Sequence, residues 1–262
     1  MPKKLLLLLG IVLLFIAAYF GWLKFHDIFT EKITPVAELP MQNPLNQTDT
    51  TLQESKTFDK TEFSFSDSGS PWWVVNKTRP LPQGYVPPDL IVPNVRLRLG
   101  ASNEQMQISS QIESDLKAMF AAATNEHVSL VFGSGYRSEA LQRQFYNSYV
   151  AQDGQAEADR LSARPGTSEH QTGLSFDATS PSGKCHLETC FEDLPEGKWL
   201  RENAHKYGFI IRYVKGEESV TGYDYEPWHI RWVGKTLSSE MRRTNVQTLE
   251  EFFGLPAAPD YL

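Results

Sequence analysis

Residues 168–177 read SEHQTGLSFD and place two side chains able to bind a metal, His170 and Asp177, seven positions apart. The pattern indicates a turn that enters a strand near residues 173–179. A single imidazole and a single carboxylate at this spacing are typical of a hydrogen-bonded loop. The stretch therefore needs partners from elsewhere in the chain before it can indicate a metal site.

A second cluster, Glu226-Pro227-Trp228-His229, supplies another imidazole. Two imidazoles and one carboxylate from separate segments make a three-ligand zinc set. Such a set leaves the fourth position open for water, which is the arrangement of catalytic rather than structural sites. In a straight strand Glu226 and His229 would face opposite sides, so we expect Pro227 to bend the chain and let them converge. A lone Trp-His pair, in contrast, is typical of a core.

The third cluster, SGYRS at residues 134–138, completes a family pattern. In this order, SGYRS, SEHQTGLSFD and YEPWHIRWVG (225–234) resemble the zinc-dependent carboxypeptidases of the VanY type. These belong, with LD-carboxypeptidases of the LdcB and DacB type, to the D-alanyl-D-alanine carboxypeptidase family of peptidoglycan enzymes. The resemblance runs from about Val95 to Gly234 and is supported by SARPG (162–166), GKWLRENAHKYGF (197–209) and TGYDYE (221–226).

The resemblance implies that His170, Asp177 and His229 are the zinc ligands, the same three residues that their side-chain chemistry indicates. It also implies that Glu226 is the catalytic carboxylate, which takes a proton from water and passes it to the leaving amine. A solvated surface carboxylate is the alternative for Glu226.

Four further residues complete the set of candidate site residues. The resemblance places Arg137 in the substrate pocket, where its planar guanidinium would grip either the terminal carboxylate of the peptide or the tetrahedral oxygen. Ser168 and Gln142 resemble positions that line the same pocket, although a glutamine on a helix surface also fits ordinary solvation. Trp228 is either a pocket wall or part of the core.

We expect an α+β fold, because helical and strand patterns are interspersed without a repeated strand-helix-strand rhythm. The resemblance implies a single zinc peptidase domain of the Hedgehog/DD-peptidase type, with a small antiparallel sheet flanked by helices. The predicted elements include an amphipathic helix at 104–123, a strand ending near Gly133, a helix capped by Ser138, and a last short helix that begins with a capping box at Thr248.

The N-terminus carries a membrane signal. Lys3 and Lys4 precede nineteen uncharged residues, Leu5 to Leu23, which is long enough to span a bilayer. We predict a cytoplasmic stub and transmembrane signal anchor at 1–25, a flexible linker at 26–70 and the peptidase domain at 71–262. A cleaved signal peptide and a buried helix are the alternatives for the apolar segment.

The two cysteines and the charge balance limit the other possibilities. The net charge of −7 argues against nucleic-acid binding. Cys185 and Cys190 predict a small disulfide loop in an oxidising exterior, whereas a Cys-His-Cys metal site with His186 is the rival interpretation.

Taken together, the sequence predicts a monomeric enzyme at the bacterial cell membrane, with its domain outside the cytoplasm, that removes terminal D-alanine from peptidoglycan stem peptides. A cross-bridge endopeptidase and a non-catalytic, zinc-containing wall-binding module are the alternatives. DD- and LD-specificity stay open.

Overall fold

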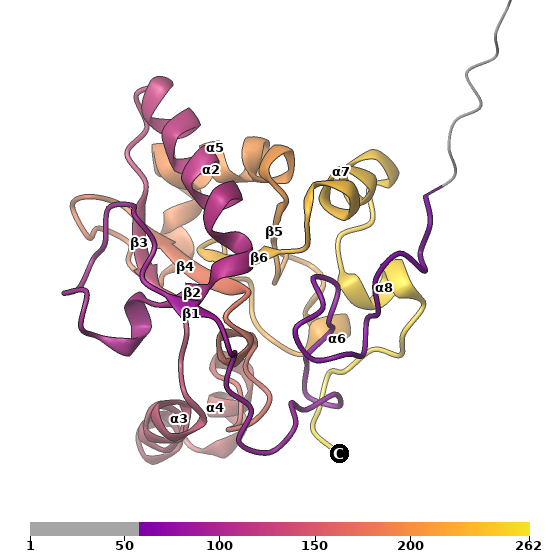
Figure 1. Cartoon of the computed structure of the whole chain (residues 1–262). Helices are drawn as coiled ribbons and strands as arrows, with labels where there is room; N and C mark the ends of the chain where they lie inside the picture. The colour runs from indigo at the N-terminus through magenta and orange to yellow at the C-terminus, as the bar shows by residue number, and fades with distance from the viewer. Residues whose placement is uncertain (1–57) are drawn as a thin grey trace, which may run out of the picture. The chain divides into compact units, whose positions relative to one another are not determined.

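A computed structural model describes residues 58–262 of the chain. The predicted anchor, and the predicted linker up to residue 57, lie outside the described residues. From residue 58 onward, no helix is both long and apolar enough to cross a bilayer. The described part is an α+β domain in which helices lie on both sides of a small antiparallel sheet (Figure 1).

The strands in residues 58–262 form two antiparallel sheets. A pair, β1 with β2, lies beside a four-stranded sheet of order β3-β4-β6-β5. The strands are β1 (Leu90–Ile91), β2 (Ile108–Ser109), β3 (Val131–Ser134), β4 (Ser175–Thr179), β5 (Phe209–Ile211) and β6 (His229–Trp232).

The helices lie in two groups around the four-stranded sheet. In Figure 1, α2 and α5 lie on one side of it, and α3 and α4 lie on the other. The α-helices are α2 (Glu113–Asn125), α3 (Glu139–Asp153), α4 (Gln155–Leu161), α5 (Pro195–Asn203), α6 (Glu218–Thr221), α7 (Lys235–Thr244) and α8 (Leu249–Phe253). Short 3-10 helices cover Glu104–Met106, Ser110–Ile112, Glu169–Thr172, Thr189–Asp193 and Ala204–Tyr207.

The two central strands separate a hydrophobic core from a polar face. Side chains alternate along a strand, so Phe176 of β4 and its register partner Ile230 of β6 both point into the core. Helices α2 and α5 cover that core, where burying a side chain such as Phe176 stabilises the fold by about 1.5–3 kcal/mol. The neighbouring residues Asp177 and His229, also register partners, therefore point to the opposite face.

The predicted helix at 104–123 is wrong in its first half. Helix α2 begins only at Glu113, and a 3-10 helix, strand β2 and a second 3-10 helix precede it. The side chains of Asn103 and Ser109 accept hydrogen bonds from the amides of Gln105 and Gln111, and these N-caps begin the two short 3-10 helices. Met106, Ile108 and Ile112 are buried in this segment without forming an α-helix, so their roughly helical spacing reflects core packing and not a helix.

The domain begins before the predicted boundary at residue 71. Phe58 stacks on Trp72, with ring centroids 5.4 Å apart, and Phe65 lies 5.5 Å from Phe253 of α8. The segment 58–70 therefore packs against the C-terminal helix instead of belonging to a flexible linker. Its aromatic residues are too irregularly spaced to indicate a regular element, so the sequence pattern did not predict this contact.

Two of the predicted helix starts are confirmed. Ser138 caps α3 by accepting a hydrogen bond from the amide of Leu141, and Thr248 caps α8 by accepting one from the amide of Glu251. These caps matter for the site, because α3 follows Arg137 and α8 carries a buried carboxylate described below.

Candidate active site

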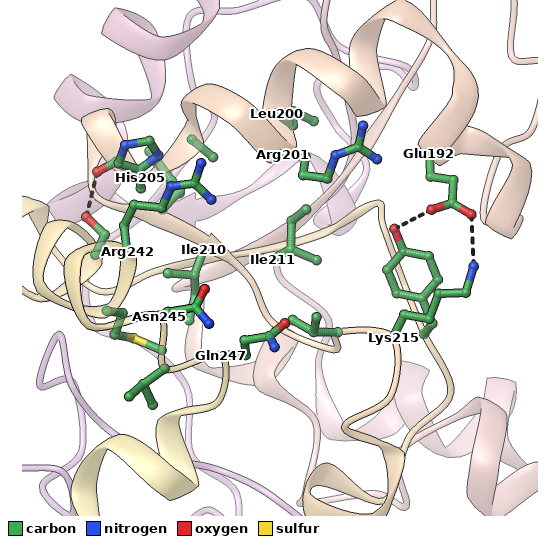
Figure 2. A pocket seen from close by; sticks show the side chains of 17 residues that line it. Glu192, Leu200, Arg201, His205, Ile210, Ile211, Lys215, Arg242, Asn245 and Gln247 are labelled. Carbon is green, nitrogen blue, oxygen red and sulfur yellow. Dashed lines mark hydrogen bonds and ion pairs between the residues drawn. The ribbon is translucent and has the colours of Figure 1, made fainter.

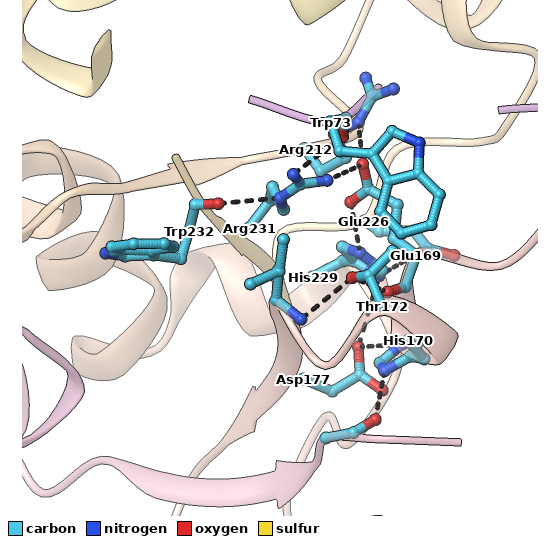
Figure 3. Close-up of polar contacts among 12 residues, drawn as sticks. Trp73, Glu169, His170, Thr172, Asp177, Arg212, Glu226, His229, Arg231 and Trp232 are labelled. Carbon is cyan, nitrogen blue, oxygen red and sulfur yellow. Dashed lines mark hydrogen bonds and ion pairs between the residues drawn. The ribbon is translucent and has the colours of Figure 1, made fainter. Parts of the chain in front are cut away.

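Three metal-binding side chains meet on the polar face of the sheet (Figure 3). His170 comes from the 3-10 helix Glu169–Thr172, Asp177 from the middle of β4, and His229 from the first position of β6. Asp177 Oδ1 lies 3.4 Å from His170 Nε2 and 3.6 Å from His229 Nδ1. All three side chains are buried, with at most 6% of any of them exposed.

The two oxygens of Asp177 have different surroundings. Oδ2 accepts a hydrogen bond of 2.5 Å from the hydroxyl of Ser134, the residue opposite it on β3. Oδ1 is buried and has no hydrogen-bond partner, so it is free to face the two imidazoles. Burial opposes ionisation, but His170, His229 and Arg137 together hold the pKa of Asp177 well below its usual range.

A close approach between strands makes this register possible. A Cβ atom on Gly133 would lie 2.8 Å from the carbonyl oxygen of Asp177, so only glycine fits at this irregularity in β3. The irregular pairing next to Gly133 brings Ser134 opposite Asp177.

The backbone and a neighbouring acid decide which nitrogen of each imidazole faces the centre. His170 Nδ1 lies 2.7 Å from the carbonyl oxygen of Gly135, which can only accept, so Nε2 keeps its lone pair. His229 Nε2 faces a carboxylate oxygen of Glu169 at 3.4 Å, and Nδ1 points toward Asp177. These contacts leave His170 Nε2, Asp177 Oδ1 and His229 Nδ1 as the three donor atoms available to a metal ion.

These atoms fit a zinc ion. Zinc binds nitrogen and carboxylate oxygen at about 2.0–2.2 Å in a tetrahedron, whose ligand atoms are then about 3.3–3.6 Å apart. The separations of 3.4 and 3.6 Å from Asp177 Oδ1 to the two nitrogens match this edge length. The unpartnered Oδ1 also has no other bonding role in the described protein.

Glu226 lies beside the same point, as the expected bend requires. The amide of His229 donates to the carbonyl of Glu226 at 3.2 Å, which closes a tight turn through Pro227 just before β6. Glu226 Oε2 is 3.4 Å from His229 Nδ1, and 16% of the Glu226 side chain is exposed. Burial raises the pKa of this carboxyl, which makes it a better proton acceptor than a surface glutamate.

Arg137 faces the centre from the start of α3. Its Nη2 lies 3.8 Å from Asp177 Oδ2, and its Nη1 donates to Gln142 Oε1 at 2.9 Å. Gln142 is fully buried, and its Nε2 donates to Ser162 Oγ and to the carbonyl of Ala163. The solvated interpretation of Gln142 is therefore wrong, because the packing of α3 against α4 turns this position inward.

All eight candidate residues line one cleft with a volume of about 750 Å³. Ser168 is buried at its wall. Both interpretations of Trp228, as a pocket wall and as part of the core, are correct, because it lines the cleft and also packs against the core. The structure thus brings the predicted residues together, and their individual roles stay predictions.

A disulfide loop forms part of the cleft wall. Cys185 and Cys190 are bonded, as expected, so their sulfurs are not free to complete a Cys-His-Cys metal site. Leu187 at the tip of the loop is 40% exposed and lines the cleft, as do Tyr149 and Leu161 from α3 and α4. The cleft therefore has an apolar rim in addition to its polar centre.

Opening this loop is expected to weaken substrate binding while the metal stays bound. Cys185 and Leu187 both have positive φ angles, 55° and 56°, which non-glycine residues rarely adopt without external restraint. We predict that reducing the disulfide raises KM about tenfold, equivalent to losing about 1.4 kcal/mol of contact energy. Steady-state kinetics with and without reductant measure this, and zinc content should not change.

The double variant Cys185→Ser/Cys190→Ser controls for other effects of the reductant. It should show the raised KM without reductant and no further response when reductant is added. An unchanged KM in both the reduced protein and the double variant would contradict a role for the loop in binding.

A second cavity, of about 400 Å³, lies at the free edge of β5 between α5 and α7 (Figure 2). Its lining combines Ile210 and Ile211 with Arg201, His205 and Arg242. Neither of the groups of metal-binding side chains found in residues 58–262 lies in it. The group of His170, Asp177 and His229 lies in the first cleft instead.

Sequence reasoning missed the charged residues beneath the site. Glu169, Arg212 and Arg231 are completely buried and joined by ion pairs. Burial opposes ionisation, but the two guanidinium groups hold the pKa of Glu169 well below its usual range. Glu169 lies inside the quoted motif next to His170, and that position is the one signal that could have drawn attention to it.

A His-Asp-His group able to hold one metal ion, with a carboxylate beside it and a guanidinium in the same cleft, is the arrangement expected of a metallopeptidase. The family described as VanY, D-alanyl-D-alanine carboxypeptidase, matches residues 105–235. The chain belongs to this family and carries its peptidase domain.

Individual relatives agree with this assignment. YodJ of Bacillus subtilis (strain 168), whose name classes it as a carboxypeptidase, is 42% identical over 69% of this chain. That match spans 66% of the length of YodJ itself. The structure of the LD-carboxypeptidase LdcB has a TM-score of 0.68 at 40% identity, over 71% of this chain and 87% of LdcB.

Two VanY structures add ligand information. VanYB in complex with D-alanine-D-alanine has a TM-score of 0.56 at 30% identity, over 69% of this chain and 96% of VanYB. A D,D-pentapeptidase VanY from a VanB-type resistance cassette, in complex with Zn(II), has the same TM-score, identity and coverage of this chain, and 97% of its own length is covered. The donor set described above has the atoms to hold the same ion.

Proposed function

We propose that this protein is a zinc carboxypeptidase that removes the terminal D-alanine from peptidoglycan stem peptides. One observation carries the proposal: the three donor atoms, Glu226 and Arg137 all face one cleft. The VanYB complex with D-alanine-D-alanine supports the choice of substrate.

The residues around the centre have complementary tasks. Zinc, when bound, would lower the pKa of the attacking water and polarise the scissile carbonyl. Glu226 accepts the proton of the attacking water and delivers it to the leaving amine, because its carboxylate lies beside the donor atoms and its pKa is raised by burial. Arg137 binds the negative charge of the peptide, either at its terminal carboxylate or at the developing oxyanion.

Removal of a terminal residue is favoured over cutting within a cross-bridge. Arg137 is held by Gln142, which is itself fixed by Ser162 and Ala163, so a buried polar wall stands behind the guanidinium. A fixed positive charge against a wall suits a free terminal carboxylate, whereas an endopeptidase needs room for the chain to continue.

The location of the enzyme is also part of the proposal. We infer that the predicted signal anchor holds the domain outside the cytoplasm, where its wall substrate lies, and that the chain acts as a monomer. The Cys185–Cys190 disulfide supports the exterior location, because disulfides persist mainly in oxidising compartments. All the proposed catalytic groups come from one chain.

The proposal is tested by incubating the full-length protein in detergent with defined pentapeptide, tetrapeptide and a cross-linked peptide dimer. We expect D-alanine to be released from the pentapeptide, the tetrapeptide or both. A chelator should stop this release, and added zinc should restore it. Cleavage of the dimer alone would favour the endopeptidase, and no cleavage of any substrate would favour the non-catalytic module.

Replacing Arg137 with alanine is expected to lower kcat/KM by about 10²–10³-fold, the usual cost of removing one donor to a developing oxyanion. Peptides with a free or an amidated C-terminus separate its two possible partners. If Arg137 binds the terminal carboxylate, Arg137→Ala and the wild type should have equal kcat/KM on the amidated peptide. If Arg137 binds the oxyanion, the variant should have the lower kcat/KM on both peptides.

Arg143→Ala is the matched control, because Arg143 lies on the same helix with 57% of its side chain exposed. It should keep wild-type kinetics. Equal activity of Arg137→Ala and Arg143→Ala on every substrate would remove Arg137 from the site.

A further inference from the structure

Four buried charges form a chain of ion pairs directly beneath the metal-binding side chains. Glu169, Arg212, Arg231 and Glu250 have completely buried side chains. Arg212 donates to Glu250 through both terminal nitrogens, at 3.0 and 2.7 Å. Two negative and two positive groups balance, so the cluster is neutral as a unit. We call these four residues the charged cluster.

Glu169 connects the charged cluster to the metal site through its two oxygens. Oε1 accepts hydrogen bonds from Arg212 Nε at 2.8 Å and from Arg231 Nη1 at 2.9 Å. Oε2 is left to face His229 Nε2 at 3.4 Å, as the chain of contacts in Figure 3 shows. The arginines therefore fix the carboxylate plane, and the carboxylate faces the side of the ring opposite the donor atom.

We propose that Glu169 is a positioning residue that keeps the proton of His229 on Nε2, and so leaves the lone pair of Nδ1 free for zinc. A neutral imidazole carries one proton, and an acceptor at one nitrogen keeps the proton there. Acceptors of this kind orient metal-binding histidines and typically change metal affinity by 10–100-fold.

The same contacts extend the site beyond the matched family segment. Glu250 belongs to α8, outside residues 105–235, and its Oε1 also accepts from Asn76 Nδ2 at 2.9 Å. Arg231 Nη2 donates to the carbonyls of Pro71 and Trp73. The segments at 71–76 and 249–253 thus hold the two arginines that hold Glu169.

The experiment replaces Glu169 with glutamine in the full-length protein and measures zinc affinity by competition with a chromophoric chelator. Glutamine keeps the size of the side chain. If its oxygen accepts from the two arginines, its NH₂ group faces His229 Nε2, and the imidazole proton is driven to Nδ1, where zinc must bind. Zinc affinity is expected to fall about 10–100-fold.

Glu250→Gln is the matched control, because it removes the same charge from the charged cluster without contacting His229. It should lower the melting temperature of the zinc-free protein but reduce zinc affinity less than Glu169→Gln does. Equal losses of zinc affinity in the two variants, or a folded Glu169→Gln variant with wild-type affinity, would overturn the proposal.

Nitrogen NMR of the wild-type protein provides a test that does not require a variant to fold. The ring of His229 should show a protonated Nε2 and an unprotonated Nδ1 in the zinc-bound protein. A protonated Nδ1 with zinc on Nε2 would overturn the proposal. Neither measurement uses substrate, so a failure of D-alanine release would count against the proposed function and leave this inference standing.

Discussion

Replacing Glu226 with alanine is expected to lower the turnover of D-alanine release by about 10²–10⁴-fold, the usual contribution of a general acid-base group. Glu226 is placed for this role because its Oε2 lies 3.4 Å from His229 Nδ1, at the edge of the donor set. It does not belong to the group His170, Asp177 and His229, so the variant should bind zinc as the wild type does.

The measurement combines turnover of the substrate found in the first assay with elemental analysis of the same sample. Glu226→Gln, which keeps the shape but cannot accept a proton, should be as inactive as Glu226→Ala. Glu202→Ala, at an exposed carboxylate on α5, is the control and should keep full activity. Wild-type turnover in a zinc-loaded Glu226→Ala protein would eliminate the proposed mechanism.

Replacing His170 with alanine is expected to abolish tight zinc binding and, with it, all activity. His170 supplies one of three protein donors, and its Nε2 lies 3.4 Å from the unpartnered Asp177 Oδ1. With two donors left, the site no longer has the three protein ligands of a catalytic zinc centre. The buried carboxylate of Asp177 also loses one of the groups that compensate its charge.

Zinc content after dialysis and the melting temperature with and without added zinc measure this effect. A ligand that binds only the folded state raises the melting temperature, so zinc should stabilise the wild type and not the variant. His205→Ala, at a histidine that lines the other cavity, should keep both its zinc and its thermal response. One tightly bound zinc per His170→Ala molecule would show that the ligand set is wrong.

The candidate site was more predictable than the fold around it. His170, Asp177, His229 and Glu226 could be named because each lies within a short motif whose residue types suit one chemistry. The prediction of one helix at 104–123 was wrong because the N-caps at Asn103 and Ser109 start short 3-10 helices in place of a continuous α-helix. The predicted start of the domain was too late, because Phe58 packs against Trp72 and Phe65 against Phe253. A local sequence pattern does not predict such contacts.

The amino-acid sequence alone determined the family and predicted the zinc cofactor and the candidate donor residues, since these depend on side-chain types at short spacings. Only the tertiary structure decided which atoms face the metal, why Gln142 is buried, and that Glu169 lies behind His229. Asp177 and His229 meet through strand register, Glu169 meets Arg212 and Arg231 across 43 and 62 positions of the chain, and Arg212 meets Glu250 across 38. Such contacts come from packing between distant segments, and no local pattern of residues encodes them.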